Sequence, residues 1–236
     1  MRRLAGRRTS RSEDGAFIVE GAILVTEAVD AGWRVTEQFL APGADPIDGA
    51  GEVRRLAAGV MEKIATTETP QPVLAVVERA FAVREILDSA SFVVVADGIA
   101  DPGNLGTILR SAEAAGADCV VLTPSTVDPT NPKVVRASAG ALFRVPIVEN
   151  LSLSDVGAAG LVRLGTSSHR GAAHTDADLM RRVAIVLGNE AHGLSDEAAV
   201  DGWISIPHSG RSESLNVAMA CTVLCFEVAR QRRRPS

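Results

Sequence analysis

The residues best suited to catalysis lie where three apolar stretches of this 236-residue chain end. The first segment, DGIADPGNLGTILRSAEAAG (residues 97–116), has Asn104 in a glycine-rich turn and Arg110 in the first turns of the helix expected after it. A cation at that place opposes the helix dipole, so we expect Arg110 to have an anionic partner. A tight strand-to-helix turn that binds no ligand is the alternative interpretation of the glycines.

The second segment, AIVLGNEAHGLSDE (residues 184–197), ends an apolar strand at Gly188, Asn189 and Glu190. Parallel sheets hold their ligands at the carboxyl ends of their strands. We therefore expect Glu190 to be the partner of Arg110, with a charge at the start of a helix as the alternative.

The third segment, WISIPHSGRSESLNVAMAC (residues 203–221), is a further strand that leads into a helix expected over residues 215–231. Ser214 and Asn216 bracket Leu215, and Ser214 is the expected helix cap. Each residue alone is typical of ordinary capping. Three such segments in one chain favour a shared ligand site.

A larger α/β domain is expected to position these segments at residues 91–236, after a small α/β domain at residues 1–80 and a linker at residues 81–90. Continuous runs of β-branched residues are typical of strands that are buried on both faces. They predict a parallel sheet with strands at residues 91–97, 119–123, 145–148, 161–166, 184–188 and 203–207.

The small domain begins with a predicted strand at residues 17–19, an amphipathic helix that includes Ile23, and a strand after Gly32. A second helix is predicted over residues 51–58. Two apolar stretches then close the domain near residue 80.

Composition limits the classes of function. The chain is 46% hydrophobic and 22% charged, has no Tyr, and carries a net charge of −5. Stacking platforms for single-stranded bases are therefore not expected, and RNA contacts would depend on arginines. Arginines cluster at both ends, where solvated tails are the alternative interpretation: Arg2, Arg3, Arg7, Arg8, Arg11, Arg230, Arg232, Arg233 and Arg234.

The expected compartment is the cytoplasm, because no stretch has the roughly 18 to 20 apolar residues of a membrane span and no signal peptide is recognisable. Three cysteines, Cys119, Cys221 and Cys225, are too few for a disulfide framework. His169 and His174 lie near two aspartates, but a solvated loop explains them better than a metal site, so no metal is expected.

Three stretches of the chain, DPGNLGTILR, LGNEAHGL and IPHSGRSESLNVA, resemble in order and spacing the motifs of the SpoU/TrmH-like branch of the SPOUT RNA methyltransferases. FIVEGAILVTEAVDAG resembles that family's L30e-like N-terminal domain for substrate RNA. The resemblance implies a deep trefoil knot, S-adenosylmethionine as cofactor, methylation of a ribose 2′-hydroxyl in a structured RNA, and a homodimer packed through the last helix. We expect ribosomal RNA as the substrate, with transfer RNA as the alternative. His208 departs from the pattern, since relatives often have an apolar residue there.

The resemblance also implies the roles of individual residues. The catalytic residues would be Asn104, Arg110, Glu190, Ser214 and Asn216. The cofactor would contact Thr166, Gly188, Asn189, Ile206, Pro207, Leu215 and Asn216. RNA would contact Arg7, Arg8, Arg11, Arg110 and Arg136.

The role of Arg110 needs a physical argument, because a guanidinium with a pKa above about 12 is a poor base. We expect Arg110, held by Glu190, to bind a phosphate or the developing alkoxide, while Ser214 orients the same hydroxyl.

Two alternatives stay open. A catalytically silent RNA-binding protein of the same fold would not need the full set of polar motif residues. A dinucleotide-dependent oxidoreductase would need the G-x-G-x-x-G spacing, which DPGNLG lacks.

Overall fold

The computed structural model describes residues 2–210 and 214–233. They form two compact units, Met1–Ala80 with Asp128–Arg144, and Phe81–Val127 with Val145–Ser236. The segment Asp128–Arg144, which lies inside the expected larger domain, thus has most of its contacts with the first unit. The boundaries at residues 80 and 90 stay a prediction.

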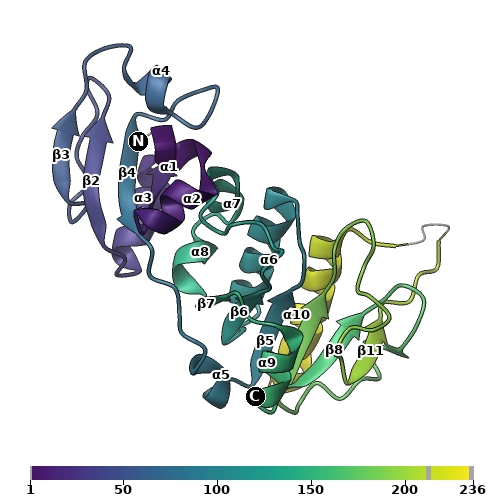
Figure 1. Ribbon diagram of the computed structural model, residues 1–236. Helices are drawn as coiled ribbons and strands as arrows, with labels where there is room; N and C mark the ends of the chain where they lie inside the picture. The colour runs from purple at the N-terminus through teal and green to yellow at the C-terminus, as the bar shows by residue number, and fades with distance from the viewer. Residues whose placement is uncertain (1, 211–213, 234–236) are drawn as a thin grey trace. The chain divides into compact units, whose positions relative to one another are not determined.

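The first unit has a four-stranded sheet in the order β1-β4-β2-β3, covered by short helices (Figure 1). Every residue of β1 is buried, and the strand pairs antiparallel with β4. Phe17, Trp33 and Phe143 form an aromatic cluster, with a hydrogen bond of 3.0 Å from Trp33 Nε1 to the carbonyl oxygen of Phe143. The elements are α1 (Arg2–Gly6), α2 (Arg8–Glu13), β1 (Ala16–Glu20), α3 (Ala22–Asp30), β2 (Val35–Leu40), β3 (Glu52–Arg55), α4 (Met61–Ile64), β4 (Val73–Glu78), α7 (Pro132–Ala137) and α8 (Ala141–Arg144).

One sequence expectation for this unit was wrong. Residues 52–55 form strand β3 rather than a helix, because their backbone pairs in parallel with β2, a partner that local propensity does not reveal. The alternative interpretation of the N-terminal arginines as a solvated tail does not apply, because all of them except Arg7 lie in α1 and α2, and Leu4 is buried in the core with Ile18, Met61 and Leu74.

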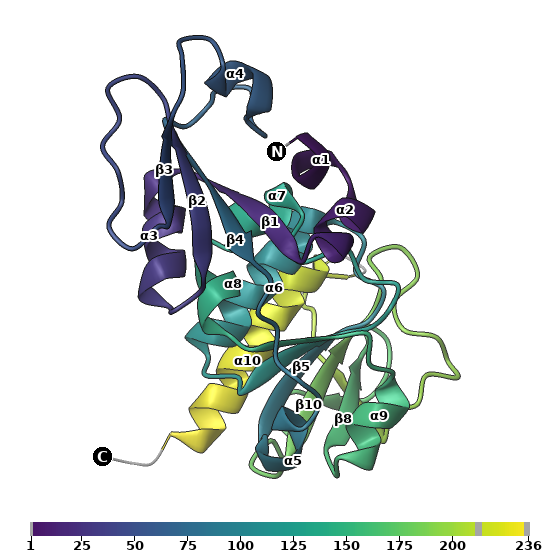
Figure 2. The same cartoon turned by 60° about the vertical axis from the view of Figure 1, so that its left-hand side comes forward.

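The second unit is built on a seven-stranded sheet in the order β7-β6-β5-β10-β8-β11-β9, and every neighbouring pair is parallel. Figure 2 labels the neighbouring strands β5, β10 and β8 of this sheet. The expected parallel sheet is confirmed, and only the short β9 was missed. All residues of β5 and β10 are buried, as their apolar sequences require. The strands are β5 (Phe92–Ala96), β6 (Cys119–Leu122), β7 (Ile147–Glu149), β8 (Val162–Thr166), β9 (Ala172–Ala173), β10 (Val183–Leu187) and β11 (Gly202–Ser205).

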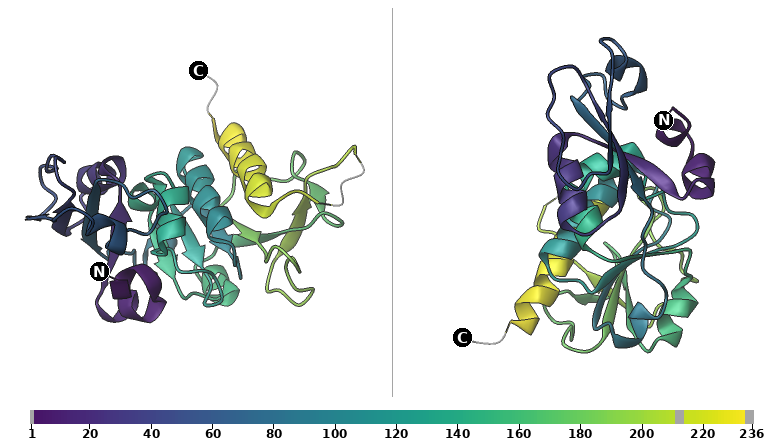
Figure 3. Two further views of the ribbon diagram at one scale, coloured as in Figure 1. Left: turned by 90° about the horizontal axis from the view of Figure 1, so that it is seen from above. Right: turned by 90° about the vertical axis from the view of Figure 1, so that its left-hand side faces the viewer.

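Two long helices, α6 (Pro102–Ala114) and α10 (Val217–Arg232), lie side by side in this unit (Figure 3). The shorter helices α5 (Ile86–Ser89) and α9 (Leu153–Ala158) contribute Leu87, Leu153 and Val156 to another core cluster, which contains Val93 and Val186 of the sheet.

Both long helices begin at places that differ from the expected ones. Asp101 caps α6 and Pro102 is its first residue, so the glycines after Pro102 belong to the helix. Asn216, not Ser214, caps α10 by accepting hydrogen bonds from the amides of Ala218 and Met219.

No helix in the described parts of the chain is long and apolar enough to cross a membrane. Within residues 2–210 and 214–233 there is also no group of three or more His, Cys, Asp or Glu side chains that could hold a metal ion.

Candidate active site

A cavity of about 690 Å³ lies at the carboxyl ends of β8, β10 and β11. Thr166 ends β8, and Gly188 and Ile206 directly follow β10 and β11. The segment before α10, with Ser214, Leu215 and Asn216, also lines the cavity. This is the edge where parallel sheets bind their ligands.

Asn104 connects the three motif segments through hydrogen bonds. Its Nδ2 donates to Glu190 Oε1 over 3.0 Å, and its Oδ1 accepts from Asn216 Nδ2 over 3.0 Å. Because Asn216 also caps α10, the chain of contacts runs from the loop after β10 through α6 to the start of α10. The structure thus brings together three of the five expected catalytic residues.

The carboxylate of Glu190 is held as an anion. Besides Asn104, the backbone amides of Ala100 and Asp101 donate to it over 3.1 and 3.0 Å. Burial has the largest single effect and raises the pKa of Glu190, but the hydrogen bonds from Asn104 and the two amides together lower it below its ordinary value. Glu190 therefore anchors the turn before α6 and is not poised to act as a general acid.

Arg110 does not pair with Glu190, so that expectation was wrong. Within the described residues Arg110 has no ion pair, its side chain is exposed, and it is not part of the cavity lining. Since α6 starts at Pro102, Arg110 lies in the third turn, about 9 Å along the axis from Asn104, where the helix dipole is weak. At this position the helix dipole does not require an anionic partner for Arg110.

The other expected cofactor residues are placed as follows. Gly188 packs so closely on the next turn that an added Cβ would lie 2.4 Å from backbone atoms of Gly193 and Leu194. Asn189 borders the cavity, but its side chain donates to the carbonyl of Gly98 and accepts from the amide of Ala191, which gives it a structural role. Pro207 is not among the lining residues.

Sequence reasoning missed a contact network at the rim of the cavity. Arg170 stacks on the Trp203 ring at 3.6 Å and pairs with Asp196 at 2.8 Å, which links the loops after β8 and β10 to β11. His208 also lines the cavity, and its Nε2 is buried without a hydrogen-bond partner among the described residues. Of these residues, only His208 could have been noticed in the sequence, because relatives often have an apolar residue at its position.

The expected RNA-contacting arginines have different environments. Arg7 and Arg8 are exposed, but Arg11 is 3% exposed and bonded to Asp128, so its guanidinium is not available to a phosphate. Arg136 is half-buried beside Thr66.

Two of the C-terminal arginines are held by contacts with the fold. Arg230 pairs with Glu227, and Arg232 donates to the backbone of Leu179, Ser91 and Arg181. Arg234 lies outside the described residues.

Fold and site together define an α/β protein with a separate small unit and a parallel sheet whose carboxyl edge carries a polar cavity. The SpoU rRNA Methylase family matches residues 91–226, and the MRM3-like substrate binding domain matches residues 1–75. The chain belongs to the SpoU rRNA methylase family.

Two named relatives and one solved structure support this family assignment. The chain is 32% identical over 94% of its length to 23S rRNA (guanosine(2553)-2′-O)-methyltransferase RlmP of Bacillus subtilis, of which it covers 91%. It is 33% identical over 97% of its length to 23S rRNA (uridine(2479)-2′-O)-methyltransferase of Streptomyces viridochromogenes, of which it covers 88%. The structure of the SpoU methyltransferase AviRb of Streptomyces viridochromogenes in complex with AdoMet superposes with a TM-score of 0.87 at 32% identity, over 98% of this chain and 96% of that one.

Proposed function

We propose that this protein transfers a methyl group from S-adenosylmethionine to a ribose 2′-hydroxyl of ribosomal RNA. The observation that carries the proposal is the hydrogen-bonded chain Glu190–Asn104–Asn216 beside a cavity at the carboxyl edge of the sheet. Both named relatives are 23S rRNA 2′-O-methyltransferases, but one acts on a guanosine and the other on a uridine. Family membership therefore supports the reaction and the class of RNA, and the nucleotide must be mapped.

The cavity suits the donor. Its volume of about 690 Å³ falls in the range of ligand pockets, roughly 300 to 1,000 Å³. Thr166, Gly188, Ile206 and Leu215 would hold the donor. The buried Nε2 of His208, which has no hydrogen-bond partner in the part of the chain that the structure describes, offers a polar contact in the wall. S-Adenosylmethionine supplies an activated methyl group on a sulfonium, which leaves the protein to position the acceptor.

Arg110 and Ser214 are the residues that we assign to the acceptor. Ser214 lines the cavity and would orient the 2′-hydroxyl. Arg110, exposed and without an ion pair among the described residues, would bind the neighbouring phosphate or the developing alkoxide and so lower the pKa of the hydroxyl. The hydroxyl proton would pass to solvent water as the methyl group moves from the sulfonium sulfur to the 2′-oxygen. Neither role requires the contact with Glu190 that the structure lacks.

Two measurements test the function. Titration calorimetry should show binding of S-adenosylmethionine and no binding of NAD. Ribosomal RNA from a strain that lacks the gene should accept radiolabelled methyl groups, and site mapping should find one 2′-O-methylated nucleotide. Absence of donor binding contradicts the proposal, and RNA binding without turnover favours the catalytically silent alternative.

We also propose that the protein is a homodimer that packs through α10. Met219, Val223 and Phe226 repeat at helical spacing on this helix and are 63%, 38% and 43% exposed, which is costly for an apolar stripe in water. Phe226→Glu should convert a dimer to a monomer in sedimentation velocity, because a carboxylate cannot be buried unpaired at the interface. Met180→Glu, at an exposed apolar position outside α10, is the matched control and should stay dimeric. A wild-type monomer, or a dimeric Phe226→Glu variant, contradicts this interface.

The cytoplasm is the compartment that we propose. All three cysteines are free and buried, and burial together with Asp118 raises the pKa of the Cys119 thiol to about 12. Such thiols are unreactive, and a ribosomal RNA substrate fits the same compartment.

A further inference from the structure

The two lysines of the chain line one cleft of the first unit. Of the 24 Lys and Arg residues, only Lys63 and Lys133 are lysines, and they lie 70 positions apart in the sequence. Both border a cavity of about 410 Å³ that is also lined by Arg136, Thr66 and Asn131 and by no described acidic residue. In a chain with a net charge of −5, this gathering of basic side chains is a local concentration of positive charge. We call it the lysine cleft.

Polar contacts hold the α7 wall of the lysine cleft against the loop after α4. Arg136 Nη1 donates to Thr66 Oγ1 over 2.7 Å. The carboxylate of Glu20, which is 4% exposed, in turn holds Thr66 through its amide at 2.8 Å and its hydroxyl, and also binds Thr67. The guanidinium of Arg136 is therefore positioned by a buried network rather than left as a mobile surface charge.

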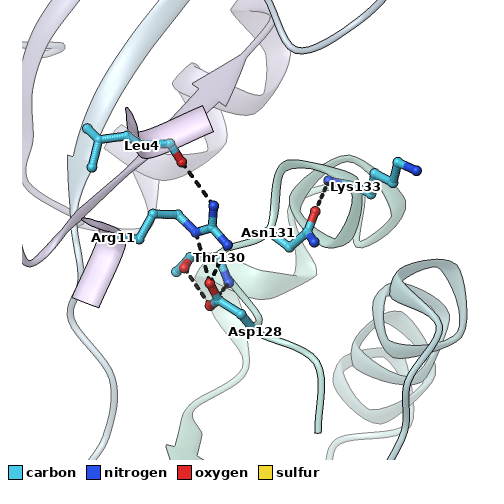
Figure 4. Close-up of polar contacts among 6 residues, drawn as sticks. All are labelled: Leu4, Arg11, Asp128, Thr130, Asn131 and Lys133. Carbon is cyan, nitrogen blue, oxygen red and sulfur yellow. Dashed lines mark hydrogen bonds and ion pairs between the residues drawn. The ribbon is translucent and has the colours of Figure 1, made fainter. Parts of the chain in front are cut away.

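A second set of contacts positions α1, whose residues Ala5 and Gly6 line the lysine cleft (Figure 4). Arg11 donates to Asp128 over 2.8 and 2.6 Å and to the carbonyl oxygen of Leu4 over 3.0 Å, which joins the end of α1 to the turn before α7. The other oxygen of Asp128 accepts from the amide and hydroxyl of Thr130. Asn131 then caps α7 by accepting from the amide of Lys133 at 2.9 Å. Arg11 thus acts on the cleft by positioning, not by contact with a ligand.

We propose that the lysine cleft binds the phosphodiester backbone of the substrate RNA, an inference that rests on the function proposed above. Three cations with neighbouring hydroxyl and amide groups are the usual donors to phosphate oxygens. None of the described lining residues has an aromatic side chain on which a base could stack. The cleft therefore fixes the register of the RNA without reading its sequence, and its preformed walls reduce the ordering cost of binding.

Chemical footprinting tests this directly, because the two lysines and the N-terminal amine are the primary amines of the chain. The protein is treated with an amine-acetylating reagent, alone and with saturating in vitro transcripts of 23S rRNA, and modification is quantified by mass spectrometry. We expect both lysines to be protected by RNA and not by a polyglutamate peptide. Equal modification with and without bound RNA overturns the proposal, and so does equal protection by polyglutamate.

Salt dependence gives a second readout. Removing Lys133 and Arg136 together, as Lys133→Gln with Arg136→Gln, should reduce the slope of log affinity against log salt by about 2, one for each lost phosphate contact. Arg55→Gln, an exposed charge of β3 in the same unit outside the cleft, is the matched control and should leave the slope unchanged. An unchanged slope in the double variant contradicts the proposal that the lysine cleft binds RNA phosphates.

The design separates the two proposals. If wild-type protein methylates ribosomal RNA while its lysines stay unprotected, the proposed function holds and the proposed role of the lysine cleft is contradicted. Wild-type protein that binds the donor but no RNA overturns both. Affinity for S-adenosylmethionine should be the same in all variants, since none of the changed residues lines the donor cavity.

Discussion

Arg11→Met should lower the free energy of unfolding of the first unit by about 3 to 5 kcal/mol. The Arg11 and Asp128 side chains are each 4% exposed, so the substitution leaves a buried carboxylate without its cation. Asp128 would keep its hydrogen bonds from Thr130, which hold only one of its oxygens. Such a loss is a large part of the stability of any small domain.

The measurement uses the two tryptophans. Trp33 lies in the first unit and Trp203 in the second, so in a Trp203→Phe background the fluorescence of Trp33 reports urea unfolding of the first unit alone. Arg34→Met, which breaks an exposed pair with Glu78, is the control and should cost less than about 1 kcal/mol. A loss for Arg11→Met no larger than that of the control contradicts the prediction.

A double variant separates the ion pair from the packing around it. Arg11→Met with Asp128→Leu should recover much of the loss, because apolar residues often replace a buried ion pair at little cost. Burial most strongly raises the pKa of Asp128, but hydrogen bonds from Thr130 and Arg11 together lower it below its ordinary value. Its contribution to stability is therefore present above the unfolded pKa of about 3.9 and is lost as the pH falls below it. The advantage of wild type over the double variant should shrink below about pH 4.

Arg110→Ala should reduce kcat about 10²- to 10³-fold, the usual effect of removing one donor to a developing oxyanion. The affinity for S-adenosylmethionine should be unchanged, since Arg110 does not line the cavity. Single-turnover methylation at saturating RNA separates this effect from weaker RNA binding.

Two further variants sharpen the test of Arg110. Arg110→Lys keeps the charge but loses the planar fork of donors, so turnover should also fall well below that of wild type. Arg181→Ala, at another exposed arginine of the same unit, should retain full activity. Near wild-type turnover of Arg110→Lys with unchanged RNA binding would falsify the proposed role.

Much of the second unit could be predicted from the sequence, because its signals are local. Runs such as FVVVA and VAIVL must be buried on both faces, and they became β5 and β10 at the centre of the sheet. The polar residues after the strands could be assigned to one site, since the carboxyl ends of parallel strands share an edge.

The partner of Glu190 could not be predicted in the same way. Arg110 was expected because opposite charges attract, but the structure places Asn104 and two backbone amides there. The sequence did contain a local signal for the start of α6, because Asp101 followed by Pro102 is typical of a helix start. A helix that starts there places Arg110 about two turns beyond the residues that bind the Glu190 carboxylate. Which of several donors reaches a carboxylate depends on distances of a few ångströms, and those follow from how α6 packs.

By itself, the sequence determined the parallel sheet of the second unit, with every strand except the short β9, and the motifs that place the protein in its family, because periodicity and motif spacing are properties of neighbouring residues. Only the tertiary structure decided that residues 52–55 are a strand and that Arg11 is a buried structural residue. It also decided that Lys63 and Lys133 share a cleft. Each of these depends on a partner far away in the chain, 117 positions for Arg11 and Asp128, and no local pattern encodes such a pairing.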